Sequence, residues 1–413
     1  LTPPSGVGDG FRLILRDRHG SIRIIRAGSQ PSPRWQNNGN RAIASWSGPL
    51  RDEGGAVHRI GVRVSYAVVT PDPPDEEFRI QLYLDNHSDA TVLEVWLPSI
   101  GGLAALGGDV VGSNPAIRRP LRLPFGDWAP HYPGAIPMAF VDIGGPKGLY
   151  YGAYEKTARI KLLRVMESDG DIAARVTHLP FLKPGGSFAS CASVFRFHDG
   201  GYAAAGRIYR KWFLRTFGMK DPRKDWLRRQ SFFQMTMVML PEGNINYRYK
   251  DIPRLARDAR KYGVTAIQIA GWQRGGHDNG YPYYEPDPRL GTWDDLRRAI
   301  AECHRMGVRV YFFINLQPAM MDIDWYRTEL RAYEAKSEMG DPFWIAGWGM
   351  GTLASRIGLT TPLMAFLDPA FPRYADELLA YYRKLASIGA DGVHIDKMYP
   401  QGVNANPHAP LPA

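Results

Sequence analysis

The segment Ala390-Asp391-Gly392-Val393-His394-Ile395-Asp396-Lys397-Met398 decides the fold of the second half of this chain. It has the pattern of a buried strand that stops on a carboxylate. Because strand side chains alternate between two faces, Gly392, His394 and Asp396 share one face and the branched residues between them share the other. The branched face can pack against a helix. A charged residue at the carboxyl end of a parallel strand indicates chemistry rather than packing.

Strands alternate with helices throughout the region that precedes this segment. The expected strands are 231–240, 264–270, 308–315 and 391–396; helices begin near Asp251, Thr292 and Pro372 and end near Gly263, Gly307 and Gly389. Crossovers in series imply a parallel sheet. We therefore predict a TIM-type (β/α)8 barrel of which only about the first four βα units are present. An open four-stranded sheet is the alternative.

The first half of the chain has a different pattern, with many short strands and no helical period. Turn signals separate the strand-like runs, which include 11–15, 22–25, 62–66, 78–84 and 172–176. This pattern is typical of a β-sandwich. Residues 202–217 have helical spacing, and the boundary to the second domain is expected around 218–229. The prediction is thus a multidomain β plus α/β protein: a sandwich (1–200), a helical linker (201–229) and a half-barrel (230–413).

Composition excludes several classes of function. The chain is 44% hydrophobic and carries a net charge of +10, but no apolar run reaches the roughly 18 residues of a membrane helix. Its basic residues are scattered and do not interleave with aromatics as in a nucleic-acid site. An acidic sugar polymer would suit the charge. Cys191 and Cys303 form no disulfide framework or metal cluster. The start lacks Met, so we expect a processed chain, secreted or periplasmic.

The loop after the second barrel strand, residues 271–288, mixes aromatic rings with amides, a histidine and carboxylates. Sugars need this mixture, because rings stack on their C–H faces while polar side chains bond the hydroxyls. A Gly/Pro-rich connector with scattered aromatics is the plainer interpretation. The predicted substrate-binding residues are Trp272, Gln273, His277, Asp278, Tyr281, Tyr283, Glu285, Asn315, His394 and Lys397.

Asp396 is the predicted catalytic nucleophile. Retaining glycosidases use one carboxylate to trap an oxocarbenium-like centre and a second to donate a proton. A helix cap or a salt bridge at the strand end is the structural alternative for Asp396. No spacing singles out the proton donor among Glu242, Asp278, Glu285, Asp287 and Asp368. No nucleotide-binding loop, hydrolase elbow or zinc spacing is present, so no cofactor is expected, and calcium is not indicated.

Two parts of the chain resemble known proteins. The segments 78–103, Tyr132-Pro133-Gly134 and 148–152 resemble the galactose-mutarotase-like supersandwich that precedes many glycosidase barrels. Residues 270–272, 280–282 and 389–396 are similar to a poorly characterised family of barrel glycoside hydrolases related to the α-galactosidase (melibiase) clan.

This resemblance implies a role for Asp396, because the clan's nucleophile is an aspartate that ends strand four. Gly271-Trp272 matches a Gly-Trp of the clan, but Ile269-Ala270 replaces the acidic residues that often precede it. That replacement weakens an α-galactosidase assignment. The clan's proton donor comes from a later strand, so we expect it beyond residue 413.

The leading hypothesis is a retaining glycoside hydrolase that acts on an oligo- or polysaccharide. Two rivals stay open: a non-catalytic carbohydrate-binding protein, which would keep the aromatic loop, and a polysaccharide lyase, since supersandwich domains also occur in lyases.

Overall fold

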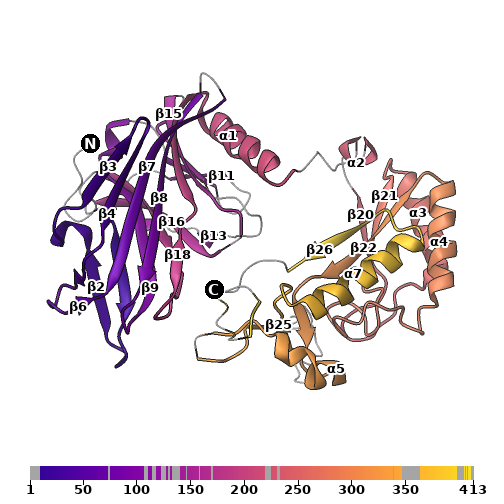
Figure 1. Ribbon diagram of the computed structural model, residues 1–413. Coiled ribbons are helices and arrows are strands. Elements are labelled where there is room, and N and C mark those ends of the chain that lie inside the picture. The colour runs from indigo at the N-terminus through magenta and orange to yellow at the C-terminus, as the bar shows by residue number, and fades with distance from the viewer. Residues whose placement is uncertain are drawn as a thin grey trace. The chain divides into compact units, whose positions relative to one another are not determined.

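The computed structural model describes residues 10–72, 75–106, 110–113, 118–121, 127–128, 131–132, 140–145, 147–157, 159–168, 171–218, 225–229, 233–337, 339–346, 363–397, 404, 406 and 408–410. The chain is mostly β-sheet with some helices (Figure 1). It divides into two compact units, Leu1–Asp221 and Pro222–Pro412. The predicted boundary around 218–229 includes residues 219–224, which lie outside the described residues, as do Pro133 and Gly134 of the resemblance.

Two antiparallel sheets form the first unit. The seven-stranded sheet has the order β12 (Asp127–Trp128), β16 (Lys161–Ser168), β17 (Asp171–His178), β9 (Thr91–Ile100), β1 (Arg12–Arg16) and β2 (Ile22–Arg26), with β13 (His131–Tyr132) beside β16. The ten-stranded sheet has the order β11 (Arg118–Leu121), β10 (Val110–Ser113), β14 (Phe140–Ile143), β15 (Lys147–Tyr154), β19 (Ala192–Asp199), β8 (Asp75–Asn86), β7 (Ile60–Asp72), β4 (Arg41–Trp46) and β3 (Arg34–Asn38), with β18 (Ser187–Ala189) on β8. A separate hairpin pairs β5 (Leu50–Arg51) with β6 (Val57–His58).

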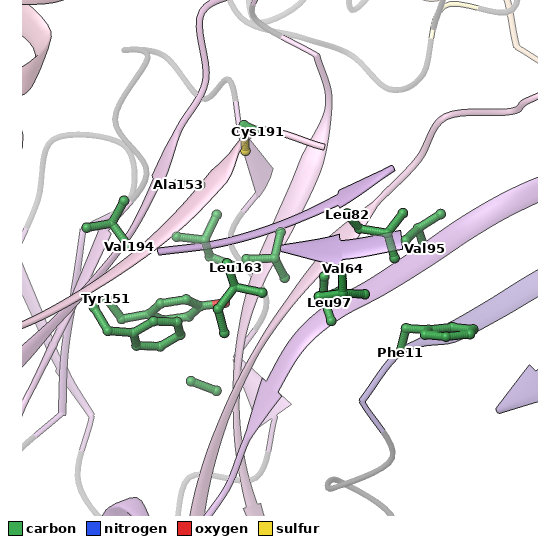
Figure 2. Packing of buried hydrophobic residues seen from close by; sticks show 14 of the residues in the cluster. Phe11, Val64, Leu82, Val95, Leu97, Tyr151, Ala153, Leu163, Cys191 and Val194 are labelled. Carbon is green, nitrogen blue, oxygen red and sulfur yellow. The ribbon is translucent and has the colours of Figure 1, made fainter. Parts of the chain in front are cut away.

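The core of the first unit lies between these two sheets. Val95 and Leu97 of the seven-stranded sheet and Val64, Leu82 and Tyr151 of the ten-stranded sheet belong to one buried cluster (Figure 2). Burial alternates residue by residue along much of β8, as expected of a strand with one face in a core. The strands predicted in this half are present as β1, β2, β7, β8 and β17.

Helix α1 (Gly201–Thr216) belongs to the first unit, although the sequence prediction placed it in a linker. Its aromatic side packs on the ten-stranded sheet. The ring of Tyr209 stacks 5.5 Å from that of Phe140, and the ring of Trp212 stacks 4.3 Å from that of Tyr154. Aromatic pairs of this kind add to the area that the helix buries, so α1 is part of the packed unit rather than a free spacer.

The second unit is built on a parallel sheet whose four strands follow the chain order: β20 (Gln234–Met237), β21 (Ala266–Ala270), β22 (Arg309–Asn315) and β26 (Gly392–Asp396). Helices α3 (Ile252–Arg260), α4 (Trp293–Arg305) and α7 (Pro372–Ser387) connect them, and α2 (Asp225–Arg229) precedes them. The predicted strands and helices are therefore present. The strand expected at 231–240 is the shorter β20, and residues 231–232 lie outside the described residues.

One face of this sheet packs against the helices, and α3 and α4 lie beside the strands in Figure 1. Ile269 and Phe312 share a buried cluster with Leu296 and Ile300 of α4. The helix expected to begin near Thr292 is capped there, because the Thr292 hydroxyl accepts from the backbone N–H of Asp295 at 3.2 Å and the Asp295 carboxylate accepts from the N–H of Thr292 at 2.8 Å. The opposite face of the sheet carries Gln268, Phe313, His394 and Asp396.

Between β22 and α7 the chain makes an excursion with its own small sheet. The sheet has the order β23 (Pro318–Met320), β25 (Leu363–Phe366) and β24 (Trp344–Ala346), and α5 (Asp324–Thr328) lies within the excursion. The two ends of the excursion meet, because the backbone N–H of Leu367 donates to the carbonyl of Gln317 at 2.9 Å.

Candidate active site

The candidate site lies at the carboxyl ends of β22 and β26. In the parallel register Asn315, the last residue of β22, is the partner of Asp396, the last residue of β26. The Asn315 side chain is buried at 1% exposure, whereas the carboxylate of Asp396 is 42% exposed. The predicted nucleophile therefore stands open at the end of β26, whose residues are exposed or half-buried, beside the largely buried β22.

Lys397 bridges two carboxylates at this point. Its Nζ lies 2.9 Å from Oδ2 of Asp396 and 3.2 Å from Oδ1 of Asp278. A regular strand would send consecutive side chains to opposite faces. Lys397 instead has a φ of +49°, and this left-handed backbone ends the strand alternation. The Lys397 ammonium group can therefore reach the carboxylate of Asp396, the residue that precedes it in the chain.

The pKa of Lys397 is raised above its ordinary value of 10.5. Burial by itself would lower this pKa, but the negative charge of Asp278 and the hydrogen bond and charge of Asp396 outweigh the effect of burial. Lys397 consequently carries a positive charge beside Asp396 at neutral pH.

Asp278 reaches Lys397 from the loop after β21, and Tyr281 of the same loop supports it. The Tyr281 hydroxyl donates to Oδ1 of Asp278 at 3.3 Å and accepts from the Asp278 backbone N–H at 3.2 Å. Tyr281 has no exposed surface, and burial raises its pKa well above 10. Tyr281 therefore serves to hold Asp278 rather than to meet solvent.

Two histidines lie on either side of Phe313, a core residue of β22. The Phe313 ring lies 4.9 Å from the ring of His277 and 5.4 Å from that of His394. Burial and the charge of Lys397 lower the pKa of His277, although Asp278 acts against them. Gln268 on β21 donates from its amide to Nδ1 of His394 at 2.7 Å. This bond leaves Nε2 of His394 as the ring's second hydrogen-bonding atom.

Trp272 and Gln273 are completely buried. The indole N–H of Trp272 donates to the carbonyl of Phe313 at 2.9 Å, and its ring lies 5.1 Å from Phe312. The Gln273 amide donates to carbonyls within its own loop, at Gly276 and Asn279. A stacking platform for a sugar needs an exposed ring face, so Trp272 is a core residue here. Gln273 stabilises its own loop through these hydrogen bonds.

A close backbone approach shapes the same loop at Gly271. Its φ is +67°, and a Cβ atom there would lie 2.2 Å from the carbonyl oxygen of Met239. Only glycine fits such a position without displacing backbone. The Gly-Trp pair of the sequence is therefore explained by packing on both residues.

Tyr283 and Glu285 extend farther into solvent. The Tyr283 ring is half-buried, 5.4 Å from the ring of Trp325. Glu285 is exposed. Of the ten predicted binding residues, the structure gathers Asp278, His277, His394, Asn315 and Lys397 around or beside Asp396 and Phe313, through the contacts above.

The other loop carboxylates differ in how firmly they are held. Asp287 is bonded by the Arg289 side chain at 2.9 and 2.8 Å and by the Gly275 N–H, and the Arg289 bonds lower its pKa to about 2. Asp368 accepts from the Ala370 N–H and the Asn404 amide, each at 2.9 Å. Glu242 and Glu285 have no ion pair with any residue that the structure describes.

Buried polar atoms without partners occur in both units, and several lie on or just after the strands of the parallel sheet. Both side-chain atoms of Asn315, Oε1 of Gln268, Oε1 of Gln317 and Oε1 of Glu242 are buried and have no hydrogen-bond partner among the described residues. An unmet buried polar group costs about 1–3 kcal/mol, so such groups require an explanation. A ligand rich in hydroxyls would supply the missing bonds.

Sequence reasoning missed Gln268 and Gln317. A signal was available for Gln268, because it is the polar residue in the otherwise apolar strand Ala266–Ala270. Gln317 gives no such signal, since it lies just outside a strand and only the packing buries its oxygen.

Within the described ranges, no cluster of three or more His, Cys, Asp or Glu side chains is placed to hold a metal ion. Across the same ranges, the helices are too short or too polar to cross a bilayer.

Solved structures share this fold at low sequence identity. The α-N-acetylgalactosaminidase NagBb of Bifidobacterium bifidum, in complex with GalNAc, is 12% identical with a TM-score of 0.65; the match covers 97% of this chain and 67% of that one. The GH36 α-galactosidase AgaA of Geobacillus stearothermophilus is 14% identical with a TM-score of 0.51, and the match covers 92% and 54%. The galactosidase domain of the α-galactosidase-sucrose kinase AgaSK is 13% identical with a TM-score of 0.51, again covering 92% and 54%.

This chain thus spans between about half and two thirds of the length of these glycoside hydrolases. No curated protein matches its sequence. A family model does match residues 189–403, which is more than half of the chain, and its description is a domain of unknown function. The chain belongs to the DUF6259 family.

Proposed function

We propose that this protein is a retaining glycoside hydrolase that acts on an oligo- or polysaccharide, with Asp396 as its nucleophile. The observation that carries the proposal is the position of Asp396, an open carboxylate at the end of a parallel strand. Its salt bridge with Lys397 at 2.9 Å also fits the structural alternative, and the activity test below separates the two. Charged residues at such strand ends are catalytic in barrel enzymes.

The proposal treats the four parallel strands as the first four βα units of a TIM-type barrel. Three features support this: the strands follow chain order, helices cover one face, and the opposite face carries Gln268, His394 and Asp396. The first unit would then be the supersandwich of such enzymes. The likeness to NagBb and AgaA over most of this chain agrees with that arrangement.

In the proposed reaction the Asp396 carboxylate attacks the anomeric carbon as the glycosidic bond breaks, and a glycosyl ester forms. A second carboxylic acid protonates the leaving oxygen and later takes a proton from the attacking water. Lys397 holds Asp396 in place and withdraws negative charge from the oxygen that it contacts. The Asn315 amide, which has no partner among the described residues, and Nε2 of His394 would bond sugar hydroxyls.

The resemblance places the proton donor on a later strand. Within the described loops the remaining candidates are Glu242 and Glu285, because Asp278, Asp287 and Asp368 are held by the bonds above. Of these two, Glu242 has a buried Oε1 without a hydrogen-bond partner among the described residues, whereas Glu285 is exposed.

A panel of aryl glycosides tests the proposal, and it includes the α-galactoside and α-N-acetylgalactosaminide that the neighbours' names suggest. The wild-type chain should release the phenol from at least one of them. Asp396→Ala should lose at least about a thousandfold in rate, as loss of a nucleophile does, and added azide should restore part of it as a glycosyl azide. Asp324→Ala is the matched control, since that side chain is 94% exposed.

An unchanged rate in Asp396→Ala would remove the nucleophile assignment. Saturable glycan binding by calorimetry, with no turnover across the panel, would instead favour a carbohydrate-binding protein.

A further inference from the structure

A second polar cluster lies in the first unit, on the face of its seven-stranded sheet opposite the core, which we call the outer face; β17 is buried on this face as well. Alternation along β17 puts Ala174 and Val176 in the core and Arg175 and Thr177 on the other side. The partner of Thr177 on β9 is Trp96. Arg12 of β1 faces Trp96 from the other side, and Arg164 of β16 is the register partner of Arg175.

Trp96 stands at the centre of this cluster. The guanidinium carbon of Arg175 lies 3.7 Å from the centre of its ring, and that of Arg12 lies 4.6 Å from it. Both contacts are favourable cation–π interactions, but the two cations repel each other. The nearby carboxylate, Glu94, accepts the indole N–H of Trp96 at 2.6 Å.

Arg175 is the unusual member of the group, because it is only 7% exposed. Its Nε is buried and has no hydrogen-bond partner among the described residues, and the same holds for Oγ1 of Thr177. Burial, together with the charges of Arg164 and Arg12, lowers the pKa of Arg175 to about 10. Buried charges are ordinarily paired. Arg12 and Arg164 have further contacts of their own, so the buried hydrogen-bonding atoms without partners are those of Arg175 and Thr177.

We propose that this outer face binds an oxyanion, which is a carboxylate, sulfate or phosphate group, through Arg175 and Thr177 with Arg12 beside them. A guanidinium presents its N–H groups as a planar fork that matches two oxygens of such a group. The Thr177 hydroxyl adds a neutral donor, and the anion offsets the repulsion between the arginines. This site belongs to the first unit and does not depend on the glycosidase proposal.

The oxyanion has two possible sources, a free inorganic anion or an acidic sugar, and calorimetry on the full chain at low salt separates them. The titrants are sodium sulfate, sodium phosphate, galacturonate and, as a neutral match for the last, galactose. Saturable binding of sulfate or phosphate without galacturonate assigns a small-anion site. Binding of galacturonate without galactose assigns a sugar acid. Either result supports the site.

Arg175→Met should weaken the binding at least about tenfold, because a hydrogen bond to a charged group contributes a factor of this order. Arg63→Met is the control: Arg63 is an exposed arginine whose guanidinium lies 5.6 Å from the ring of Tyr83 in the other sheet, and its loss should leave the affinity unchanged.

Thr177→Val tests the same site with almost no change of shape and should weaken binding several-fold, even if Arg175→Met fails to fold. Two results would overturn the proposal. The first is no saturable binding of any of the three anions up to about 10 mM, which would already be a weak affinity. The second is equal affinities in wild type and Thr177→Val.

Discussion

Asp278, on the loop after β21, contacts Lys397, at the end of β26, across 119 residues of chain, with 3.2 Å between Oδ1 and Nζ. The two side chains are 3% and 13% exposed. This contact joins the loop to the strand that carries Asp396, so the geometry of the candidate site depends on it.

Removing the lysine should therefore cost substantial stability. Lys397→Met leaves a buried carboxylate without its cation, and breaking a buried pair from one side costs about 3–5 kcal/mol. Urea unfolding would measure the loss. Asp278→Asn combined with Lys397→Met should recover part of it, because no buried charge then lacks a partner.

Lys261→Met is the control for that experiment. Lys261 pairs with Asp258 at 2.9 Å, but both side chains are exposed, so its removal should change stability little. Equal losses in Lys397→Met and Lys261→Met would show that the bridge at the strand end has no special role.

The first unit should lose stability in acid through His178 and Glu155. Burial lowers the pKa of His178 to about 3. Burial opposes ionisation of Glu155, yet Lys161 at 2.8 Å and Arg159 lower its pKa to about 2. Both values lie below those of the unfolded chain. The stabilisation that each group gives to the folded state is therefore complete above the pKa of that group in the unfolded chain. It is lost as pH falls, between about 6.5 and 3 for His178 and between about 4.5 and 2 for Glu155.

His178→Gln should flatten the fall of stability below pH 6.5, since an amide does not titrate. Urea midpoints at a series of pH values would show the change. His19→Gln, at an exposed position, should leave the wild-type slope. If stability fell as steeply below pH 6.5 in His178→Gln as in the wild type, His178 would be protonated in the folded state.

Gly271→Ala should be among the most damaging single methyl additions in the second unit. The left-handed backbone and the contact with the Met239 carbonyl together should cost about 2–5 kcal/mol. Gly263→Ala has a φ of +78° with no atom within 4 Å of the added carbon, so only the backbone strain of about 1–2 kcal/mol remains. Thermal unfolding of the pair should reproduce this order, and a reversed order would refute the close approach.

Asn315→Leu separates a binding role from a structural one. Because the Asn315 amide lacks partners in the described structure, its replacement should leave stability unchanged or raise it by about 1–2 kcal/mol. On the substrate found with the aryl panel, turnover should fall roughly tenfold or more, as with a lost substrate hydrogen bond.

Asn86→Leu is the matched control, since the amide of Asn86 is buried and bonds Ala90, Leu182 and Ser88. Its loss should cost about 3 kcal/mol at roughly 1 kcal/mol per bond. If Asn315→Leu destabilised the protein as much as Asn86→Leu, then Asn315 would be a structural residue.

The local pattern of the chain predicted the four parallel strands, their three connecting helices and several strands of the first unit, because their signals are local. The Thr292 cap, the glycines at helix ends and the alternation before Asp396 each depend on a few neighbouring residues. The buried state of Trp272 could not be predicted in this way. An aromatic residue after a glycine suits a sugar platform or a core equally, and only the packing of Phe312 and Phe313 distinguishes the two.

The bridge at Lys397 was unpredictable for a related reason. Strand periodicity places Lys397 away from Asp396, and it is a left-handed backbone, rare for lysine, that reverses this. Asp278 likewise becomes a partner only through a contact that spans 119 residues. Such contacts depend on the assembled sheet and leave no trace in residue spacing.

The excursion between β22 and α7 is tied both to its neck and to the core of the second unit, because Met320, Tyr326 and Met364 belong to the same buried cluster as the parallel sheet. It leaves the sheet at Gln317 and returns at Leu367, where one backbone bond closes its neck. A closed neck lets length and sequence vary inside it at small entropic cost. The excursion also touches the site, because the Met320 N–H donates to the carbonyl of Tyr281 at 2.9 Å, the residue that supports Asp278. A change inside the excursion that displaces Met320 would therefore be transmitted through Tyr281 to Asp278, and from there to Lys397 and Asp396.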